Sequence, residues 1–260
     1  MSGWNTGSEP IEAVLFDLGN TLVSYYRADE FAPILRRCVA AAGAVLDEHV
    51  GAARGRTDVE AACERALRCN VERGDYRVWP LAERLERVFA LDGPDPRLVE
   101  RLGAAFLEPI FATAKLDPEA IETLRSIRLL GLKTAIVSNT PWGSPAAPWR
   151  AELTRHALLR EVDAAVFCVD VGWRKPARAP FDRALEVLGA SASRCWFVGD
   201  DPIWDVEGAR RAGLTPVVLA ADRNESRALG RGNSAGRAAL SLGRLGDLVQ
   251  LVKRSRSAGQ

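Results

Sequence analysis

Histidine is scarce in this chain, and long apolar runs are missing. The 260 residues include two histidines, His49 and His156, which leaves little material for a histidine-based metal site or catalytic triad. No segment approaches the roughly 18 consecutive apolar residues that a membrane-spanning helix needs, so we expect no membrane partner. The polar N-terminus, MSGWNTGSEP, also lacks the basic and apolar regions of a secretory signal peptide.

Net charge is also close to zero. The formal charge at pH 7 is +1, so electrostatics gives no reason to expect a nucleic-acid partner. The five cysteines are odd in number, scattered and without Cys-x-x-Cys spacing. This pattern indicates free thiols in a reducing compartment and predicts a cytoplasmic protein. An apolar fraction of 47% is ordinary for a globular chain and sufficient for a sizeable core.

The most informative stretch is residues 11–22, IEAVLFDLGNTL. Its apolar run ends on a carboxylate, Asp17, and the residues after Asp17 suit a tight loop. A short apolar run bounded by turn residues predicts a buried strand. Ligands of open α/β sheets bind just beyond the carboxyl ends of strands, which puts Asp17 where chemistry would occur. The alternative is that Asp17 only opens a turn.

From residue 24 to about residue 112 the composition changes to a block rich in Ala, Arg, Leu and Glu. Apolar residues recur there at helical spacing, with breaks near 51–55, 74–80 and 92–96. The block therefore predicts an all-helical insertion. The expected buried helix faces are Phe31, Ile34, Leu35, Cys38 and Val39; Ala62, Ala66, Leu67 and Val71; Leu81, Leu85, Val88 and Phe89; and Leu98, Leu102, Ala105 and Phe106.

Beyond residue 112 the pattern alternates between strand and helix. After the first strand at 11–17, further strands are expected at 133–138, 164–169, 195–199 and 216–219. Helices are expected between Pro118 and Gly131, after Trp149, and at 180–188, 202–212 and 242–252, with a polar loop at 221–237. Such alternation favours a parallel sheet covered by helices on both faces.

The helical block interrupts this α/β pattern directly after its first strand. The predicted domains are therefore an α/β core, residues 1–23 and 113–260, and a helical domain, residues 24–112. A domain inserted at this point would lie over the carboxyl ends of the strands. We interpret it as a lid that excludes water and selects the substrate; the alternative is an appendage that only stabilises the core.

Polar groups follow four of the predicted strands, in the order Asp17, Ser138, Lys175, and Asp200 with Asp205. This order resembles the four motifs of the haloacid dehalogenase superfamily. The matching segments are FDLGNTLV, AIVSN, GWRKPARAPFDRAL and FVGDDPIWDVEGARRAGL. The resemblance spans about residues 11 to 219. It implies a Rossmann-like core with an inserted helical cap of the C1 type. It also implies that Asp17, Ser138, Lys175, Asp200 and Asp205 have the catalytic and metal-binding roles that are derived next from their chemistry.

The residue types suit phosphoryl transfer. A carboxylate at Asp17 can attack phosphorus and form an aspartyl-phosphate, which splits hydrolysis into two steps. Asp17 and Asp200, with the backbone carbonyl of Gly19, offer oxygen ligands of the kind Mg²⁺ prefers. Three roles stay open for Asp205: it could bind the metal directly, bind it through water, or only orient Lys175. Lys175 would add positive charge to the transferring group and would hold Asp17 ionised.

Further residues are expected around a small phosphorylated metabolite as substrate. Ser138 would hold a phosphate oxygen, and the other expected phosphate or substrate contacts are Asn20, Thr21, Asn139, Trp142 and Trp173. With Trp204, the last two suggest an apolar rim; ordinary packing is the alternative. Asn20 tolerates left-handed backbone, and Asp201 is expected to cap a helix that begins at Pro202. Tyr25, Tyr26 and Arg27 lie where the chain enters the helical block and are expected to approach the substrate.

Gly19 departs from the family pattern. Phosphatases of this superfamily usually have a second Asp at that position, which protonates the leaving group and later activates water. Loss of a positioned general acid–base typically costs about 10²–10⁴ in rate, although some apparent phosphatases of the family also begin Asp-Leu-Gly-Asn. We favour a Mg²⁺-dependent phosphatase that uses another acid or a leaving group that needs little help.

Two alternatives to the phosphatase stay open. One is a phosphate-binding or regulatory protein with little or no turnover. The other is a 2-haloacid dehalogenase, since halide leaves without a proton. Those dehalogenases commonly have Tyr at the position of Gly19 and need no metal, so the acids Asp200 and Asp205 would be unexplained.

Overall fold

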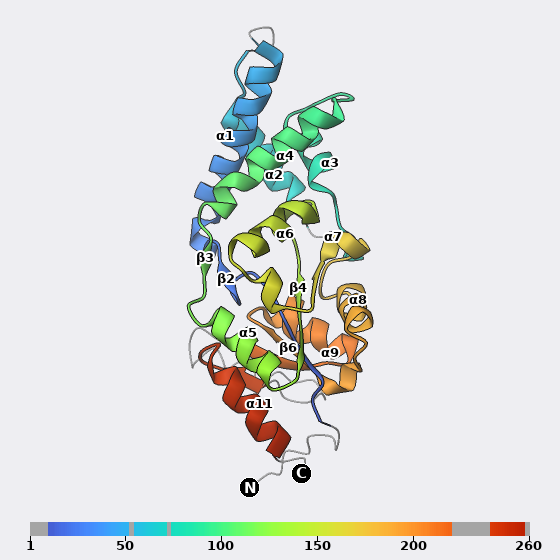
Figure 1. Cartoon of the computed structure of the whole chain (residues 1–260). Helices are drawn as coiled ribbons and strands as arrows, with labels where there is room; N and C mark the ends of the chain where they lie inside the picture. Colours follow the sequence, from blue (N-terminus) through green and yellow to red (C-terminus); the bar gives the residue numbers. More distant parts are fainter. Residues whose placement is uncertain (1–9, 52–54, 72–73, 220–239, 258–260) are drawn as a thin grey trace.

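The chain folds as an α/β core with a helical insertion stacked on one end of it (Figure 1). This structure, a computed structural model, describes residues 10–51, 55–71, 74–219 and 240–257. The predicted loop at 221–237 lies outside the described residues. None of the helices in the described ranges combines the length and the hydrophobicity that a membrane crossing requires.

A six-stranded parallel sheet forms the centre of the core. Its strands are β1 (Ala13–Phe16), β4 (Lys133–Ser138), β5 (Ala164–Phe167), β6 (Cys195–Gly199), β7 (Thr215–Leu219) and β8 (Leu240–Leu242). The order β5-β4-β1-β6-β7-β8 puts β1 between β4 and β6. The carboxyl ends of these three strands, which carry the first, second and fourth motifs, are therefore neighbours.

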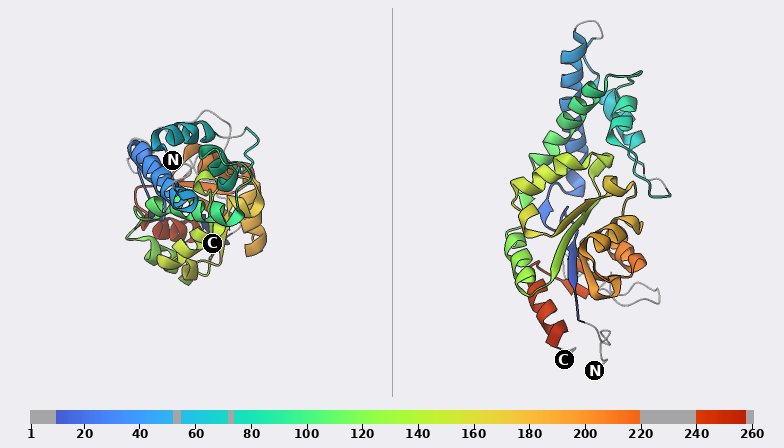
Figure 2. Two further views of the ribbon diagram at one scale, coloured as in Figure 1. Left: turned by 90° about the horizontal axis from the view of Figure 1, so that it is seen from above. Right: turned by 45° about the vertical axis from the view of Figure 1, so that its right-hand side comes forward.

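Alternate side chains of β1 enter two separate cores, which explains why its sequence is apolar throughout. Leu15 packs in a core with Phe181 of α8 (Ala179–Leu188), and α9 (Gly208–Ala212) covers the same face. Phe16 packs in the other core with Leu124 of α5 (Ala120–Leu129) and Leu248 of α11 (Asp247–Ser257). The right-hand view of Figure 2 shows these two pairs of helices on opposite sides of the sheet.

The insertion lies between β1 and β3 and stands over the carboxyl ends of the core strands (Figures 1 and 2). Where the chain leaves and re-enters the core, β2 (Val23–Ser24) pairs antiparallel with β3 (Lys115–Leu116). Strands of two residues are too short for a visible alternation, so the sequence did not predict them. The helices of the insertion are α1 (Phe31–Val50), α2 (Val59–Cys69), α3 (Leu81–Val88) and α4 (Pro96–Phe111).

Some predicted boundaries in the core are wrong. The third strand ends at Phe167 rather than at 169, and the helical turn α7 (Cys168–Val171) follows it. The last helix begins at Asp247 rather than at 242, because residues 240–242 pair with β7 as a strand. The helix expected after Trp149 is α6 (Ala146–Arg155), which already contains that residue.

The predicted apolar face of α2 is also wrong at its end. Leu67 and Val71 are each 52% exposed. The helix ends at Cys69, so Val71 lies beyond it and cannot continue the buried face formed by Ala62 and Ala66.

Candidate active site

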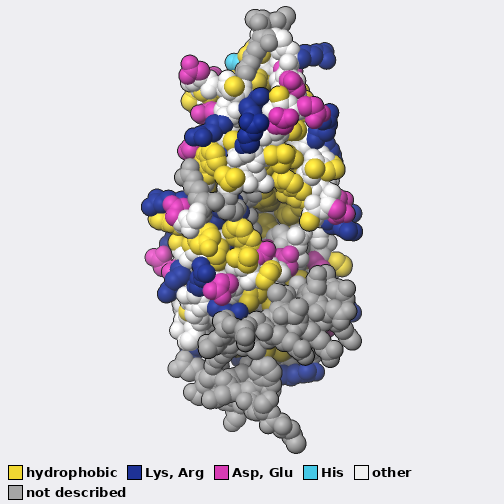
Figure 3. All heavy atoms as spheres, turned by 180° about the vertical axis from the view of Figure 1, so that it is seen from behind, with side chains coloured by type: hydrophobic (Ala, Val, Ile, Leu, Met, Phe, Trp, Pro, Cys, Tyr) yellow, Lys and Arg dark blue, Asp and Glu magenta, His cyan; other side chains and the backbone are white. Residues whose placement is uncertain are grey.

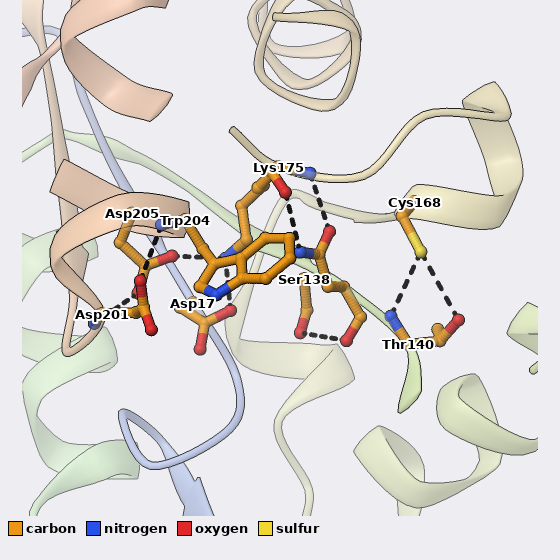
Figure 4. A network of polar contacts seen from close by, with 9 residues as sticks. Asp17, Ser138, Thr140, Cys168, Lys175, Asp201, Trp204 and Asp205 are labelled. Carbon is orange, nitrogen blue, oxygen red and sulfur yellow. Dashed lines mark hydrogen bonds and ion pairs between the residues drawn. The ribbon is translucent and has the colours of Figure 1, made fainter. Parts of the chain in front are cut away.

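Lys175 is the centre of a buried ion-pair network at the carboxyl ends of the strands (Figure 4). Its Nζ donates hydrogen bonds to Oδ1 of Asp17, at 2.5 Å, and to Oδ1 of Asp205, at 2.6 Å. Burial alone would lower the pKa of Lys175, but the charges of Asp17 and Asp205 together raise it above its usual value. The lysine is therefore charged, and it joins three loops that are far apart in the sequence.

The backbone of Lys175 is held by the side chain of Asn139, the residue after β4. Asn139 Oδ1 accepts a hydrogen bond from the N–H of Lys175 at 2.8 Å, and its Nδ2 donates to the carbonyl of Lys175 at 3.1 Å. A phosphate or substrate contact was expected of Asn139. In this structure both ends of its amide fix the loop that carries the lysine.

Asp17 follows β1 directly, and the loop after it is closed by the N–H groups of Leu22 and Val23, which both donate to the carbonyl of Leu18 at 2.9 Å. The N–H of Asp17 donates to the carbonyl of Val198 on β6 at 2.8 Å, which anchors the residue between two strands. Asn20 has a φ of 57°, so its predicted left-handed backbone is confirmed. Thr21 is buried, and its hydroxyl has no hydrogen-bond partner among the residues that the structure describes.

The fourth motif folds tightly around Asp205. Asp205 Oδ2 accepts a hydrogen bond from the N–H of Asp201 at 3.1 Å, while its Oδ1 contacts Lys175. Gly199 is required here, because a Cβ at this position would collide with the Asp205 carboxylate. Asp201 Oδ1 accepts from the N–H groups of Ile203 and Trp204, both at 2.7 Å, which confirms Asp201 as the N-cap. The helical turn that follows is π-helical over Pro202–Glu207.

Asp17, Asp200 and Asp205 form a carboxylate cluster in which one oxygen of each lies within 4.8 Å of the others. Burial raises the pKa of Asp17 to about 6 despite the attraction of Lys175. Burial, together with the charges of Asp17 and Asp205, raises the pKa of Asp200 to about 7. One lysine does not balance three carboxylates, and hard oxygen donors are the ligands that Mg²⁺ prefers. The residues therefore fit a magnesium ion.

A small cavity of about 170 Å³ opens onto this cluster. The predicted site residues that line it are Asp17, Gly19, Ser138, Asn139, Lys175, Asp200 and Asp205. Asn20, Thr21, Trp142 and Trp173 are not among its lining residues. The structure thus brings the catalytic and metal-binding candidates together at one place, and it leaves four of the five expected phosphate or substrate contacts outside.

The three tryptophans expected at the rim have different positions. Trp204 lines the small cavity. Trp142 is buried and packs edge-on against Phe106 of α4, with ring centroids 5.4 Å apart. Trp173 lies under the guanidinium of Arg77, at 4.6 Å from the ring centroid. A continuous rim of these residues is therefore not formed, and Trp142 packs the insertion onto the core.

Arg174 was not singled out by the sequence analysis, although it directly precedes Lys175. It lines the small cavity, and its guanidinium lies 5.1 Å from the ring centroid of Trp204. The guanidinium therefore lies over the face of the indole ring in a cation–π contact at the edge of the carboxylate cluster. Adjacency to the lysine in the third motif was the signal that could have identified it.

A second connection between the insertion and the core lies next to Lys175. The N–H of Val78 donates to the carbonyl of Gly172 at 2.9 Å, and the N–H of Arg174 donates to the carbonyl of Tyr76 at 2.8 Å. This antiparallel bridge ties a segment of the insertion to the three residues that precede the lysine. The position of the insertion and the position of Lys175 are therefore mechanically linked.

A larger cavity of about 850 Å³ lies where the insertion joins the core. Tyr25, Tyr26 and Arg27, which were expected to approach the substrate, line it together with Asn20 and Arg37. Figure 3 shows that the surface is hollowed between the insertion and the core, and that hydrophobic side chains gather there.

Comparison with known proteins gives a family and a set of relatives. The family model of the haloacid dehalogenase-like hydrolases matches residues 11–213. The chain is 28% identical to a glyceraldehyde 3-phosphate phosphatase of Methanopyrus kandleri, over 80% of this chain and 84% of that protein. It is 29% identical to a ribulose-1,5-bisphosphate 5-phosphatase of Halopiger xanaduensis, over 92% of this chain and 98% of that protein.

Solved structures show the same fold. A 2-haloacid dehalogenase of Pseudomonas syringae superposes with a TM-score of 0.65 at 24% identity, over 94% of this chain and 99% of that one.

Proposed function

This chain belongs to the haloacid dehalogenase-like hydrolases, and from that premise we propose that it is a Mg²⁺-dependent phosphatase acting on a small phosphorylated metabolite. The observation that carries the proposal is Lys175 held between Asp17 and Asp205 in the lining of a cavity that Asp200 also lines. The two phosphatase relatives, whose names specify small phosphorylated sugars, support this substrate class.

Asp17 is the nucleophile in this proposal. Its carboxylate oxygen forms a bond to phosphorus, and the bond from phosphorus to the leaving oxygen breaks. Water then attacks the aspartyl-phosphate and releases the Asp17 carboxylate. Lys175 orients this carboxylate through a buried ion pair and keeps positive charge beside the transferring phosphoryl group.

Asp17 and Asp200 would hold the metal, together with the backbone carbonyl of Gly19. Bound Mg²⁺ would supply positive charge to the phosphoryl oxygens, which three carboxylates and one lysine do not provide. Asp205 has one oxygen on Lys175 and the other on the N–H of Asp201. We therefore assign Asp205 first to the orientation of Lys175, and to the metal only by sharing one of these oxygens.

Ser138 lines the cavity at the end of β4, and we assign its hydroxyl to a phosphate oxygen. Asn139 acts by holding the backbone of Lys175. Residues 24–112 are assigned as the cap, with 1–23 and 113–260 as the catalytic core. The cap position over the strand ends supports its role in excluding water from the site.

The test is hydrolysis of p-nitrophenyl phosphate with and without Mg²⁺, run beside Asp17→Asn. The asparagine keeps the size of the side chain but is a far weaker nucleophile, so hydrolysis should fall to the background rate. Unchanged hydrolysis in Asp17→Asn would refute the assignment. Binding of inorganic phosphate without turnover would indicate a binding protein, and metal-independent halide release from 2-chloropropionate would indicate a dehalogenase.

A further inference from the structure

The larger cavity, where the insertion joins the core, has the size of a small-molecule site. Its volume of about 850 Å³ lies within the range of about 300–1,000 Å³ that is typical of such sites. It is lined by the first two turns of α1 and by the two connections at 24–27 and 112–115. Asn20 also lines it, while the neighbouring Gly19 lines the small cavity. Both cavities therefore adjoin the loop that follows Asp17.

Positive charge predominates among the residues that line the larger cavity. The basic residues are Arg27, Arg37 and Lys115, and the one acid among the described lining residues is Glu30. Glu30 accepts a hydrogen bond from the N–H of Arg27 at 2.8 Å, and Nε of Arg27 donates to Asp29 at 3.1 Å. Arg37 and Lys115 are exposed and have no ion-pair partner within the described ranges. These two cations can therefore bind an anion that enters the cavity.

Arg37 and Lys115 belong to different parts of the fold. Arg37 lies in α1 of the insertion, and Lys115 begins β3, on the connection back into the core. Two such cations can hold one phosphate or carboxylate group through charge-assisted hydrogen bonds. An anion bound by both would bridge the insertion and the core.

Tyr25 connects the larger cavity electrostatically with the proposed nucleophile. It lines the cavity, and its ring packs edge-on against Trp149 of α6, with centroids 5.5 Å apart. Its hydroxyl is buried without a hydrogen-bond partner among the described residues. Burial raises the pKa of this hydroxyl well above its usual value, and the charges of Glu152 and Asp17 raise it further. The hydroxyl is therefore a protonated donor within electrostatic reach of Asp17, and a polar ligand would satisfy it.

The remaining lining of the cavity is largely apolar. It includes Tyr26, Pro33, Ile34, Ala112 and Ala114. Such a surface can contact the carbon skeleton of a ligand, while a small number of polar groups fix its orientation. The cavity is thus suited to an organic molecule that carries an anionic group.

From the cations at Arg37 and Lys115 and the loop that both cavities share, we infer that the larger cavity receives the part of the substrate that is not transferred, and that these two residues bind a second anionic group on it. The substrates are then small metabolites with one phosphoryl group at Asp17 and a second phosphate or a carboxylate farther along the skeleton. The inference rests on the proposed phosphatase function and specifies the class of its substrates.

The experiment compares matched phosphate esters on the Mg²⁺-loaded protein. The probes are α,ω-alkanediol bisphosphates of increasing chain length, with the ω-hydroxyalkyl and ω-carboxyalkyl phosphates of the same length. At the best-fitting length, kcat/KM for one of the doubly anionic probes should exceed that for the hydroxyalkyl phosphate by about 10-fold or more, beyond the statistical advantage of two equivalent ends. The bisphosphate and carboxylate arms identify the second group.

Two further features are expected of this preference. It should have an optimum in chain length, because Arg37 and Lys115 lie at a fixed place relative to Asp17. It should also weaken as the salt concentration rises, because both cations are exposed and their attraction is screened.

Variants of the two cations locate the second group. Arg37→Met and Lys115→Met should each lower the ratio of kcat/KM between the doubly anionic probe and the hydroxyalkyl phosphate by about 10-fold. This ratio cancels any general loss of activity. The matched control is Arg97→Met, which removes an exposed cation at the start of α4, outside the lining of the cavity, and should keep the wild-type ratio. Thermal unfolding shows whether each variant has kept its fold.

The outcomes separate the inference from the function on which it depends. Equal kcat/KM for all three kinds of probe at every chain length overturns the inference and leaves the phosphatase intact. A preference that persists in both Arg37→Met and Lys115→Met, or that Arg97→Met lowers as much, also overturns it. Failure to hydrolyse any of these probes or p-nitrophenyl phosphate with Mg²⁺ overturns the proposed function itself.

Discussion

Replacing Lys175 with methionine is expected to destabilise the protein strongly, and the size of the effect follows from its surroundings. Lys175 is 1% exposed and neutralises two carboxylates, Asp17 and Asp205, that are 8% and 2% exposed. Methionine has a similar length but no charge. It would leave two buried carboxylates side by side without a counter-ion.

The size of this loss in the free energy of unfolding follows from the cost of breaking a buried ion pair. Removing one partner of a buried ion pair costs about 3–5 kcal/mol. Even with Lys175 in place, burial raises the pKa of Asp17 to about 6, so this carboxylate is already destabilised in the folded wild-type protein. Without the lysine this penalty grows, so we expect Lys175→Met to lose about 3–5 kcal/mol above pH 7.

The same reasoning predicts a pH dependence with a definite sign. A carboxyl group whose pKa is raised in the folded state lowers the stability of the protein at high pH. This loss disappears as the pH falls below the pKa that the group has in the unfolded state. Lys175→Met should therefore be closer to wild type at low pH than at high pH, as its carboxylates take up protons.

Urea unfolding of metal-free protein measures these differences, with the exposed Lys115→Met as the matched control. Adding Asp17→Asn to Lys175→Met should recover part of the lost stability, because one of the two unpaired charges is then removed. A loss below about 1 kcal/mol for Lys175→Met, or a loss that does not change with pH, would refute the account of the network as a buried charge balance.

Two further predictions concern the metal and the insertion. The pKa values of Asp17, about 6, and Asp200, about 7, put their ionisation near neutrality. Mg²⁺ should therefore raise the Tm of the protein more at about pH 8 than at about pH 5. Equal Tm shifts at the two pH values in calorimetry would argue against these acids as ligands. Trp142→Ala should cost about 3–5 kcal/mol in urea unfolding because its ring is buried against Phe106. Trp204→Ala should mainly lower kcat/KM. A large loss of stability for Trp204→Ala together with a loss of activity alone for Trp142→Ala would contradict their assigned positions.

Local patterns were sufficient to predict most of the core. β1 is a short apolar run that Asp17 follows, and β4 and β6 are similar runs that end at Ser138 and Gly199. In each case the apolar run and the residue that stops it lie within a few neighbouring positions. The N-cap at Asp201 was predictable for the same reason, since a capping side chain bonds to backbone only two or three residues away.

Elements that depend on distant partners were not predictable. β8 has three residues and is a strand because β7 pairs with it. The bridge between Tyr76 and Arg174 forms across about a hundred residues of sequence, and neither segment shows alternation. Trp142 and Trp204 have similar places in their motifs, yet one packs on α4 and the other lines the cavity.

The sequence by itself determined the α/β core, the helical insertion and the identity of the residues that could carry out phosphoryl transfer. This was possible because strand ends and helix faces depend on patterns among residues that are close together in the sequence. Only the tertiary structure decided how charge is balanced among these residues. It put Lys175 between Asp17 and Asp205 and used the amide of Asn139 to hold the lysine. Contacts of this kind join side chains that no local pattern relates, and they form only when the loops after separate strands meet.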